Sequence, residues 1–355
     1  MVLNSKLPKS YPLRNSPGLH IHSVGFGTFD PALFVNPSAS KDSVRIATLE
    51  ALEAGYRHID TAFSYGSEKQ VGAAIQEWIS AGKGKREDLW VTSKLYNTFH
   101  NPDDVKVGME LSLRDLGLEY GGFALEFIPT AYVPSVDYTP VKRPDGRPEV
   151  DIPLSLNYMS TWRAMEDLVT GGLAKAIGIS NFSLLKTARL LSSNLRLKPA
   201  VNQVELHPYL PQHDLLAFCA LHGIHVTAHS PLGGRPVPFV APNAHLPGPM
   251  TDKTILSLAA QYEKTPAQVL LSWAVQRGTS VVPKSVTGER IRGNLVLFEM
   301  REEDVKKVSE IWRELPEVRT DELGVAQGRR ANDPRLHVGF DIYREDVEEP
   351  IVEGI

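Results

Sequence analysis

Cysteine is almost absent from this chain, which has 355 residues and a single cysteine, Cys219. One cysteine cannot form an intramolecular disulfide, so the disulfide-stapled class of small secreted scaffolds is excluded and a reducing compartment is favoured. Cys219 lies in a stretch with apolar residues at helical spacing, from Leu215 to Leu221. We therefore interpret it as a buried structural thiol rather than a nucleophile.

Long apolar runs and runs of one charge are missing as well. No stretch of about 18 apolar residues occurs, so no membrane-spanning segment is predicted. Residues 1–18 lack the apolar core of a secretory signal. The formal net charge of −4, without Lys/Arg runs, gives no reason to expect nucleic acid or a membrane surface as a partner. We expect a cytoplasmic monomer that acts on a small molecule, and we predict no metal site.

A Gly-x-Gly-x-x-Gly motif after an early strand is also missing, and a doubly wound dinucleotide-binding sheet would need one. The sequence instead contains short apolar or β-branched stretches that alternate with stretches of helical periodicity. Such alternation predicts parallel βα units. The expected strands are residues 24–27, 56–60, 89–94, 123–128, 175–181, 200–205, 225–229 and 280–283.

Polar residues gather at the C-terminal ends of these expected strands, which is where a barrel builds its active site. They are Asp60, Lys94, Asn181, Gln203, Ser230 and Lys284. We therefore predict an α/β fold, a (β/α)8 TIM barrel with an N-terminal β-hairpin, as one domain over residues 1–355. The barrel is expected at about 21–314. Long βα loops at 129–153 and 235–252 and a C-terminal tail at 315–355 are expected over its mouth.

Asp60, Tyr65 and Lys94 form the candidate catalytic group. A phenol has a pKa of about 10, so it needs help from its surroundings to act as an acid near neutral pH. An ammonium group favours the charged form of the phenol, and a carboxylate keeps that ammonium charged and in place. A single strand-end lysine or aspartate is more often a solvated surface charge. Three such groups, each at or just after a strand end, favour a proton-donating site.

The stretch 55–72 resembles the signature of the aldo-keto reductases, which are NAD(P)H-dependent carbonyl reductases built on a (β/α)8 barrel. The resemblance extends over roughly residues 21–298. It implies that Tyr65 is the proton donor, supported by Asp60 and Lys94. The family's fourth catalytic residue is a histidine at the end of the fourth strand. In the corresponding stretch 116–129 no histidine occurs, and an ungapped comparison puts Phe127 at its position.

Loss of that histidine would change the chemistry, because Phe127 cannot donate a hydrogen bond to a developing alkoxide. Removal of one such donor typically costs ~3–4 kcal/mol of transition-state stabilisation. One branch of the family has a glutamate at this position and reduces an enone C=C bond. Glu126 is adjacent, but side-chain alternation predicts that it points to the other side of the strand. A carboxylate paired with a cation outside the barrel is the preferred interpretation of Glu126.

The same resemblance implies a cofactor site. Ser180, Asn181 and Gln203 correspond to residues that hydrogen-bond the nicotinamide carboxamide. His229 takes the place of a tyrosine that stacks on the ring, and two interpretations of it stay open: stacking on the nicotinamide, or filling space without contact to the cofactor. Lys284, Ser285 and Arg290 correspond to residues around the adenosine 2′-phosphate, which implies NADPH rather than NADH, and Asn294 corresponds to the adenine contact. The remaining expected cofactor contacts are Thr28, Asp60, Ser230, Leu232 and Val286.

The substrate pocket is expected to be lined by Phe29, Tyr96, Phe127 and Ile128. Such an apolar, aromatic lining suits a bulky apolar substrate. We predict an NADPH-dependent oxidoreductase that transfers hydride to a carbonyl or a related C=N or C=C group. Two alternatives stay open: a non-redox cyclase or isomerase derived from this family, and a non-catalytic cofactor-binding protein. The intact set of Asp60, Tyr65 and Lys94 argues against the second alternative.

Overall fold

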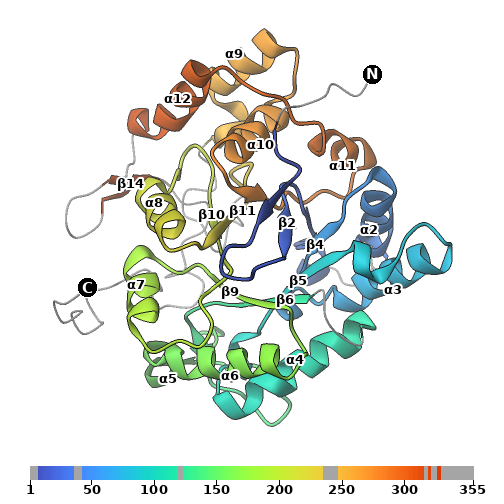
Figure 1. The fold of residues 1–355 in the computed structure, drawn as a ribbon, viewed down its shortest axis with the longest axis vertical. Helices are drawn as coiled ribbons and strands as arrows, with labels where there is room; N and C mark the ends of the chain where they lie inside the picture. Colours follow the sequence, from blue (N-terminus) through green and yellow to red (C-terminus); the bar gives the residue numbers. More distant parts are fainter. Residues whose placement is uncertain are drawn as a thin grey trace.

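Eight parallel strands form the centre of the molecule (Figure 1). The structure is a computed structural model. It describes residues 7–35, 42–118, 123–234, 247–315, 319–320 and 326–328, with the backbone alone for 34–35, 123–126, 319–320 and 326–328. In sheet order the strands are β3 (Phe26–Gly27), β4 (His58–Asp60), β5 (Trp90–Lys94), β6 (Phe123–Phe127), β9 (Ala176–Ser180), β10 (Val201–Glu205), β11 (His225–His229) and β12 (Ser280–Val281).

The first and last strands meet and close the sheet into a barrel. Two parallel bridges connect them, Val24 with Val281 and Gly27 with Lys284. Backbone hydrogen bonds run alongside, including one of 3.1 Å from Gly27 N to the Pro283 carbonyl. A Cβ atom at position 27 would lie 2.7 Å from the carbonyl oxygen of Val282, so this close approach requires glycine.

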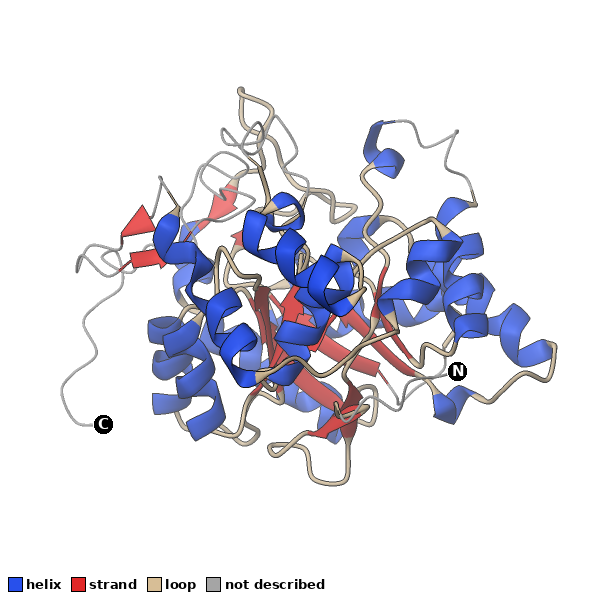
Figure 2. Cartoon of the chain, turned by 90° about the horizontal axis from the view of Figure 1, so that it is seen from above, coloured by secondary structure: helices blue, strands red, loops and turns tan. Residues whose placement is uncertain are grey.

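Helices surround the barrel on its outside, as the view at right angles shows (Figure 2). Their ends follow local signals: α4 ends at Gly117, which has a φ of 63°, and α10 begins with Pro266 after a Thr265–Gln268 capping box. The helices are α1 (Ala32–Val35), α2 (Ser43–Ala54), α3 (Glu68–Ser80), α4 (Pro102–Leu116), α5 (Ile152–Leu156), α6 (Tyr158–Thr170), α7 (Leu184–Ser192), α8 (His213–Leu221), α9 (Lys253–Tyr262), α10 (Pro266–Gln276), α11 (Gly288–Asn294) and α12 (Glu302–Glu310).

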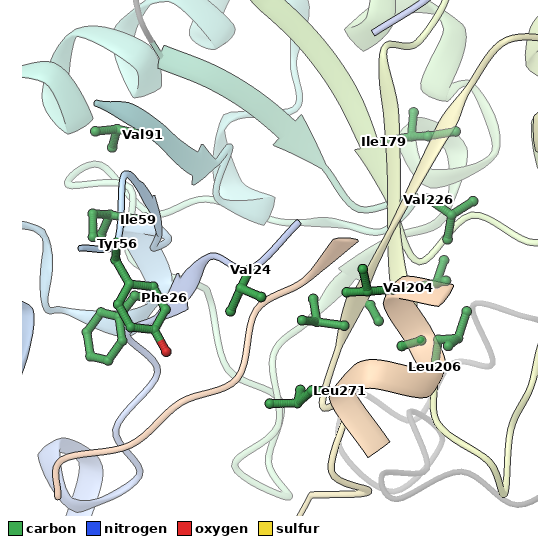
Figure 3. Close-up of a cluster of buried hydrophobic side chains, with 14 of the residues drawn as sticks. Val24, Phe26, Tyr56, Ile59, Val91, Ile179, Val204, Leu206, Val226 and Leu271 are labelled. Atoms are coloured by element: carbon green, nitrogen blue, oxygen red, sulfur yellow. The ribbon is translucent and has the colours of Figure 1, made fainter. Parts of the chain in front are cut away.

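The main apolar core lies between the strands and this ring of helices. Side chains alternate along each strand, so every second residue points outward into this layer. Ile59, Val91, Ile179, Val204 and Val226 belong to it, and Figure 3 shows them together with Leu271 of α10. The intervening residues point into the barrel. They include Asp60, Thr92, Lys94 and Gln203, whose side chains bond to one another or to other inward-facing groups.

The N-terminal hairpin covers the end of the barrel where the strands begin. It consists of β1 (Ser10–Pro12) and β2 (His20–His22), paired antiparallel. Ile21 packs with residues that start strands, including Trp90 and Val201. The hydroxyl of Tyr11 donates to the carbonyl of Val275, 2.5 Å away. Chemistry is therefore left to the opposite end of the barrel.

The predicted (β/α)8 fold is confirmed, and several expected boundaries are confirmed within one or two residues. The loop 129–153 contains a small sheet, β7 (Ala131–Tyr132) with β8 (Val150–Asp151). In the tail only the short β13 (Arg319–Thr320) and β14 (Ala326–Gly328) are described, so its predicted place over the mouth lies outside the described residues. In the described ranges no helix combines the length and apolarity needed to cross a membrane.

Two buried histidines, His58 and His100, and the half-buried His225 make the barrel sensitive to acid. Burial is the main cause that lowers the pKa of His58 and His100 to about 3 and that of His225 to about 4. Their folded pKa lies below the ordinary value near 6.5, so the unfolded chain takes up protons first as the pH falls. The contribution of these histidines to the unfolding free energy should be constant above about pH 6.5. Below that pH it should fall by up to ~1.4 kcal/mol per pH unit for each histidine.

Urea unfolding of His225→Gln at pH 7.5, 6 and 5 tests this expectation. The variant should lose less stability than the wild type between pH 6 and 5, by about 1 kcal/mol. His20→Gln is the matched control, because His20 is exposed on β2. If the unfolding free energies of wild type and His225→Gln depended on pH in the same way, the lowered pKa of His225 would be contradicted.

Candidate functional site

Lys94 and Asp60 meet inside the open end of the barrel, at the ends of neighbouring strands. Nζ of Lys94 donates to both carboxylate oxygens of Asp60, at 2.8 and 3.0 Å, and to the carbonyl of Thr61 at 3.0 Å. The side chains are 8% and 4% exposed. Gln203, from β10 across the barrel, donates its Nε2 to Asp60 Oδ2 at 2.7 Å. The buried charges are therefore paired and hydrogen-bonded.

Tyr65 joins this pair from the turn that follows β4. The turn is a short 3₁₀ helix, Phe63–Tyr65, ended by Gly66 in the left-handed conformation with a φ of 63°. Nζ of Lys94 lies 5.3 Å from the centre of the Tyr65 ring. A cation at this range stabilises a phenolate. The structure thus brings together the three residues that the sequence singled out as catalytic.

Residues at the ends of β9, β10 and β11 bond to one another around the same opening. The hydroxyl of Ser180 donates to the backbone carbonyl of Gln203 at 3.0 Å. The backbone N–H of Asn181 donates to the same carbonyl at 2.9 Å. Nε2 of His229 lies 2.9 Å from Oδ1 of Asn181, and its Nδ1 lies 3.3 Å from the hydroxyl of Ser230. Asn181 and Ser230 both have positive φ, 57° and 50°. Leu232 follows, half-buried.

Thr28 supports the presence of a ligand at this end of the barrel. Its side chain is 2% exposed, yet its hydroxyl has no hydrogen-bond partner within the described residues. Buried polar groups are normally paired, because an unpaired one loses its bonds to water. Thr28 directly follows β3, at the mouth where the cofactor is expected. A cofactor hydroxyl or phosphate would supply the missing partner, so the residues present fit a nucleotide.

The expected phosphate-binding residues lie on the segment after β12. Ser285 is buried and its hydroxyl accepts from Thr287 N at 3.1 Å, while Val286 is 50% exposed. Arg290 is exposed on α11, and Asn294 is buried at the end of that helix. Lys284 is half-buried. All of these residues lie in the short segment 284–294 that follows β12 and ends with α11.

Two acidic residues that sequence reasoning missed contact this machinery. Asp30 accepts a 3.0 Å bond from Nζ of Lys284. Glu68 begins α3, is 3% exposed and accepts from Ser93, the neighbour of Lys94, at 2.6 Å. Burial raises the pKa of Glu68 to about 7, although bonds from Ser93 and Ser112 oppose the shift. Both residues fall close to predicted site residues in the sequence, but no spacing rule connects them to their partners.

Aromatic side chains line one side of the mouth. Phe29, 40% exposed, contacts the Tyr65 ring with centroids 5.0 Å apart. Tyr96 stacks on Phe63 at 5.7 Å and meets Tyr132 edge-on at 6.3 Å. The segments that follow four strands, β3, β4, β5 and β6, contribute these rings. The sequence did not predict Phe63 and Tyr132 as members of this aromatic group.

Phe127 corrects one expectation. It was predicted to line the pocket, but its ring is fully buried between sheet and helices, 5.1 Å from Phe182 and 6.1 Å from Trp162. The register explains this: Phe127 is the Cα partner of Ile179, which points outward. Ile128 is half-buried just after the strand.

Glu126 directly precedes Phe127, so it occupies the alternate position along β6. In the sheet register Glu126 is the Cα partner of Lys94. The side chain of Glu126 lies outside the described residues, as does the loop segment 235–246. In the described ranges no group of three His, Cys, Asp or Glu side chains is arranged to hold a metal ion.

Comparisons with known proteins agree with this geometry. The pattern that defines the Aldo/keto reductase family matches residues 23–313. Aldo-keto reductase family 1 member A1-A of Danio rerio is 42% identical over 301 residues, 84% of this chain and 88% of that protein. Prostaglandin-E(2) 9-reductase of Oryctolagus cuniculus is 39% identical over 318 residues, 88% and 95% of the two chains. The structure of an aldose reductase from Schistosoma japonicum superposes with a TM-score of 0.76 at 30% identity, covering 97% of this chain and all of the other.

Glu68→Gln should change how stability depends on pH. The folded pKa of Glu68 is raised, so the folded state keeps the proton longer and stability is lost as the pH rises from about 4.5 to 7. A glutamine side chain does not titrate, so the variant does not lose stability in this pH range for this reason. Relative to the wild type, the variant should gain about 2–3 kcal/mol between pH 5 and pH 8 in urea unfolding. Glu77→Gln, an exposed site on the same helix, is the control. No gain at pH 8 would refute a costly buried charge.

Proposed function

This chain belongs to the aldo/keto reductase family, and from that premise we propose that it is an NADPH-dependent reductase that uses Tyr65 as its proton donor. The observation that carries the proposal is the group formed by Tyr65, Lys94 and Asp60 at the open end of the barrel. A protein that only bound a nucleotide would have no use for a buried ammonium beside a phenol. The expected products are the alcohol and NADP⁺.

The proton transfer follows from the charges on the three side chains. As hydride reaches the carbonyl carbon, negative charge develops on the oxygen and Tyr65 Oη donates its proton there. The phenolate that is left behind is stabilised by the Lys94 ammonium. Asp60 keeps Lys94 protonated by accepting two of its hydrogen bonds. Tyr65 then regains a proton from solvent through the partly exposed mouth.

Bound NADPH would supply the hydride, and this chain would hold it at two places. Ser180, Asn181 and Gln203 form a bonded group at the strand ends that suits the carboxamide, with His229 fixed against Asn181. Pre-ordered polar groups hold a ring in one reactive pose. The hydroxyl of Thr28 has no hydrogen-bond partner among the described residues. Ser285, Arg290 and Asn294 would bind the adenosine end, with Val286 packing beside them.

The substrate is proposed to be bulky, apolar and aromatic. The ring of Phe29 meets that of Tyr65, and the rings of Phe63 and Tyr96 stack on each other. Burial raises the pKa of Tyr96, so its phenol stays neutral at working pH. A neutral aromatic surface attracts flat apolar groups and offers no charge to a substrate anion. The chain is further proposed to act as a monomer in the cytoplasm.

Reduction of an activated C=C bond is the second candidate. The observation in its favour is the register of Glu126 with Lys94, which brings a carboxyl-bearing residue to the strand position beside the catalytic lysine. A protonated carboxyl polarises an enone oxygen and so favours hydride attack at the β-carbon.

Tyr65→Phe tests the first proposal. Wild-type protein should oxidise NADPH in the presence of members of a panel of aromatic ketones, enones and imines. The oxidation is measured as the loss of NADPH absorbance. Tyr65→Phe should lose activity by about 10²–10⁴-fold, with NADPH affinity unchanged by fluorescence titration. Phe63→Leu is the control, since it alters the pocket but not the acid. Full activity of Tyr65→Phe, or product formed without cofactor oxidation, would overturn the proposal.

Glu126→Gln separates the two candidates. If the carboxyl polarises an enone, this variant should lose enone reduction by about 10²-fold and change ketone reduction little. Glu149→Gln, an exposed site in the 129–153 loop, serves as the control. Equal effects on both substrate classes would eliminate the C=C candidate.

A further inference from the structure

Asp30 holds the lysine that was expected to bind phosphate. Oδ1 of Asp30 lies 3.0 Å from Nζ of Lys284, and the two side chains are 8% and 30% exposed. The contact is half-buried, so it is screened by solvent less than a surface pair would be. The positive charge of Lys284 is therefore already compensated by a carboxylate of this chain.

Both partners are fixed by their surroundings. Asp30 also accepts from Ala32 N at 3.3 Å and from the hydroxyl of Ser43 at 3.1 Å, so three separate segments bond to its carboxylate. Lys284 is positioned by its bridge to Gly27. Asp30 lies only three residues after Gly27. Closure of the barrel therefore places the two side chains together, and the lysine cannot leave without removing the positive charge beside a mostly buried carboxylate.

Arg290 differs from Lys284 in this respect. It is exposed on α11 and forms no ion pair with any of the described residues. Arg292, two residues on, is paired with Glu50 of α2. Of the two cations expected around the 2′-phosphate, only Arg290 thus keeps a charge that is available to an incoming anion.

We propose that Asp30 is a cofactor-specificity determinant, which weakens the preference for a nicotinamide nucleotide bearing an adenosine 2′-phosphate by keeping Lys284 in an ion pair. The inference rests on the proposed nucleotide-binding function. A dianionic phosphate must compete with Asp30 for Lys284 and is also repelled by the carboxylate. A 2′-hydroxyl meets neither effect. The preference for NADPH over NADH is then carried by Arg290, and NADH is accepted as a second cofactor.

Dissociation constants for NADPH and NADH, measured by quenching of tryptophan fluorescence at low ionic strength, test the proposal. Asp30→Asn keeps the shape and can still accept from Ala32 N, but it removes the charge. It should raise the NADPH-to-NADH affinity ratio about tenfold, since one charge-assisted bond is released to the phosphate. Asp30→Ser is a second variant, included in case asparagine disturbs α1. Its unfolding midpoint is measured to check that the variant folds.

A double-mutant cycle assigns the effect to the ion pair. Lys284→Met should change the affinity ratio less than about threefold in the wild-type background, but should abolish the tenfold gain in Asp30→Asn. Arg290→Gln should lower the ratio in both backgrounds. Asp167→Asn is the matched control. Asp167 also forms an ion pair, with Arg196 at 2.8 Å, but it lies on α6, outside the segments expected to bind the nucleotide.

The remaining outcomes are distinguishable. If wild type binds neither nucleotide, the proposed function fails. If it binds both but Asp30→Asn leaves the ratio unchanged, the role of Asp30 is overturned while the function stands. Equal weakening of both nucleotides in Asp30→Asn would also overturn it, and would identify the ion pair as a clasp over the part that both nucleotides share.

Discussion

The buried ion pair between Lys94 and Asp60 is the interaction on which the open end of the barrel depends. A buried charge that loses its partner costs roughly 3–5 kcal/mol, so neither residue could be there alone. Thr61 O and the Gln203 amide complete the bonding. Gln203 comes from β10, on the opposite side of the barrel from β4. The pair is therefore satisfied only when the barrel is closed, and this couples folding to the geometry of the site.

The two ends of the barrel carry different tasks for a physical reason. At the strand starts, the hairpin and its apolar contacts exclude water, and His58 is held neutral there by burial. At the strand ends, buried polar groups face a half-exposed mouth, where Tyr65 reaches both the lysine and solvent. Under the proposed function Tyr65 gives up a proton and has to regain one, so its phenol must stay within reach of solvent, unlike the buried His58 and His100.

Charge compensation recurs beyond the catalytic pair. Asp30 compensates Lys284 just as Asp60 compensates Lys94, but with a different consequence. Under the proposed function, the carboxylate of Asp60 keeps Lys94 charged beside Tyr65. Under the proposed role of Asp30, its carboxylate would compete with a bound phosphate for Lys284. One kind of contact would then support catalysis in one place and affect recognition in another.

The sequence by itself determined the barrel, because alternating strand and helix periodicity is a local property. It also singled out Asp60, Tyr65 and Lys94 as a group, because each lies at or just after a strand end. Contacts between distant segments were not visible in it. Which face Phe127 occupies depends on a one-residue register, and that register is set by pairing with β9. The bond from Asp30 to Lys284 exists only because barrel closure brings two ends of the chain together. Tertiary structure therefore decided which residues face the mouth and which charges are already paired.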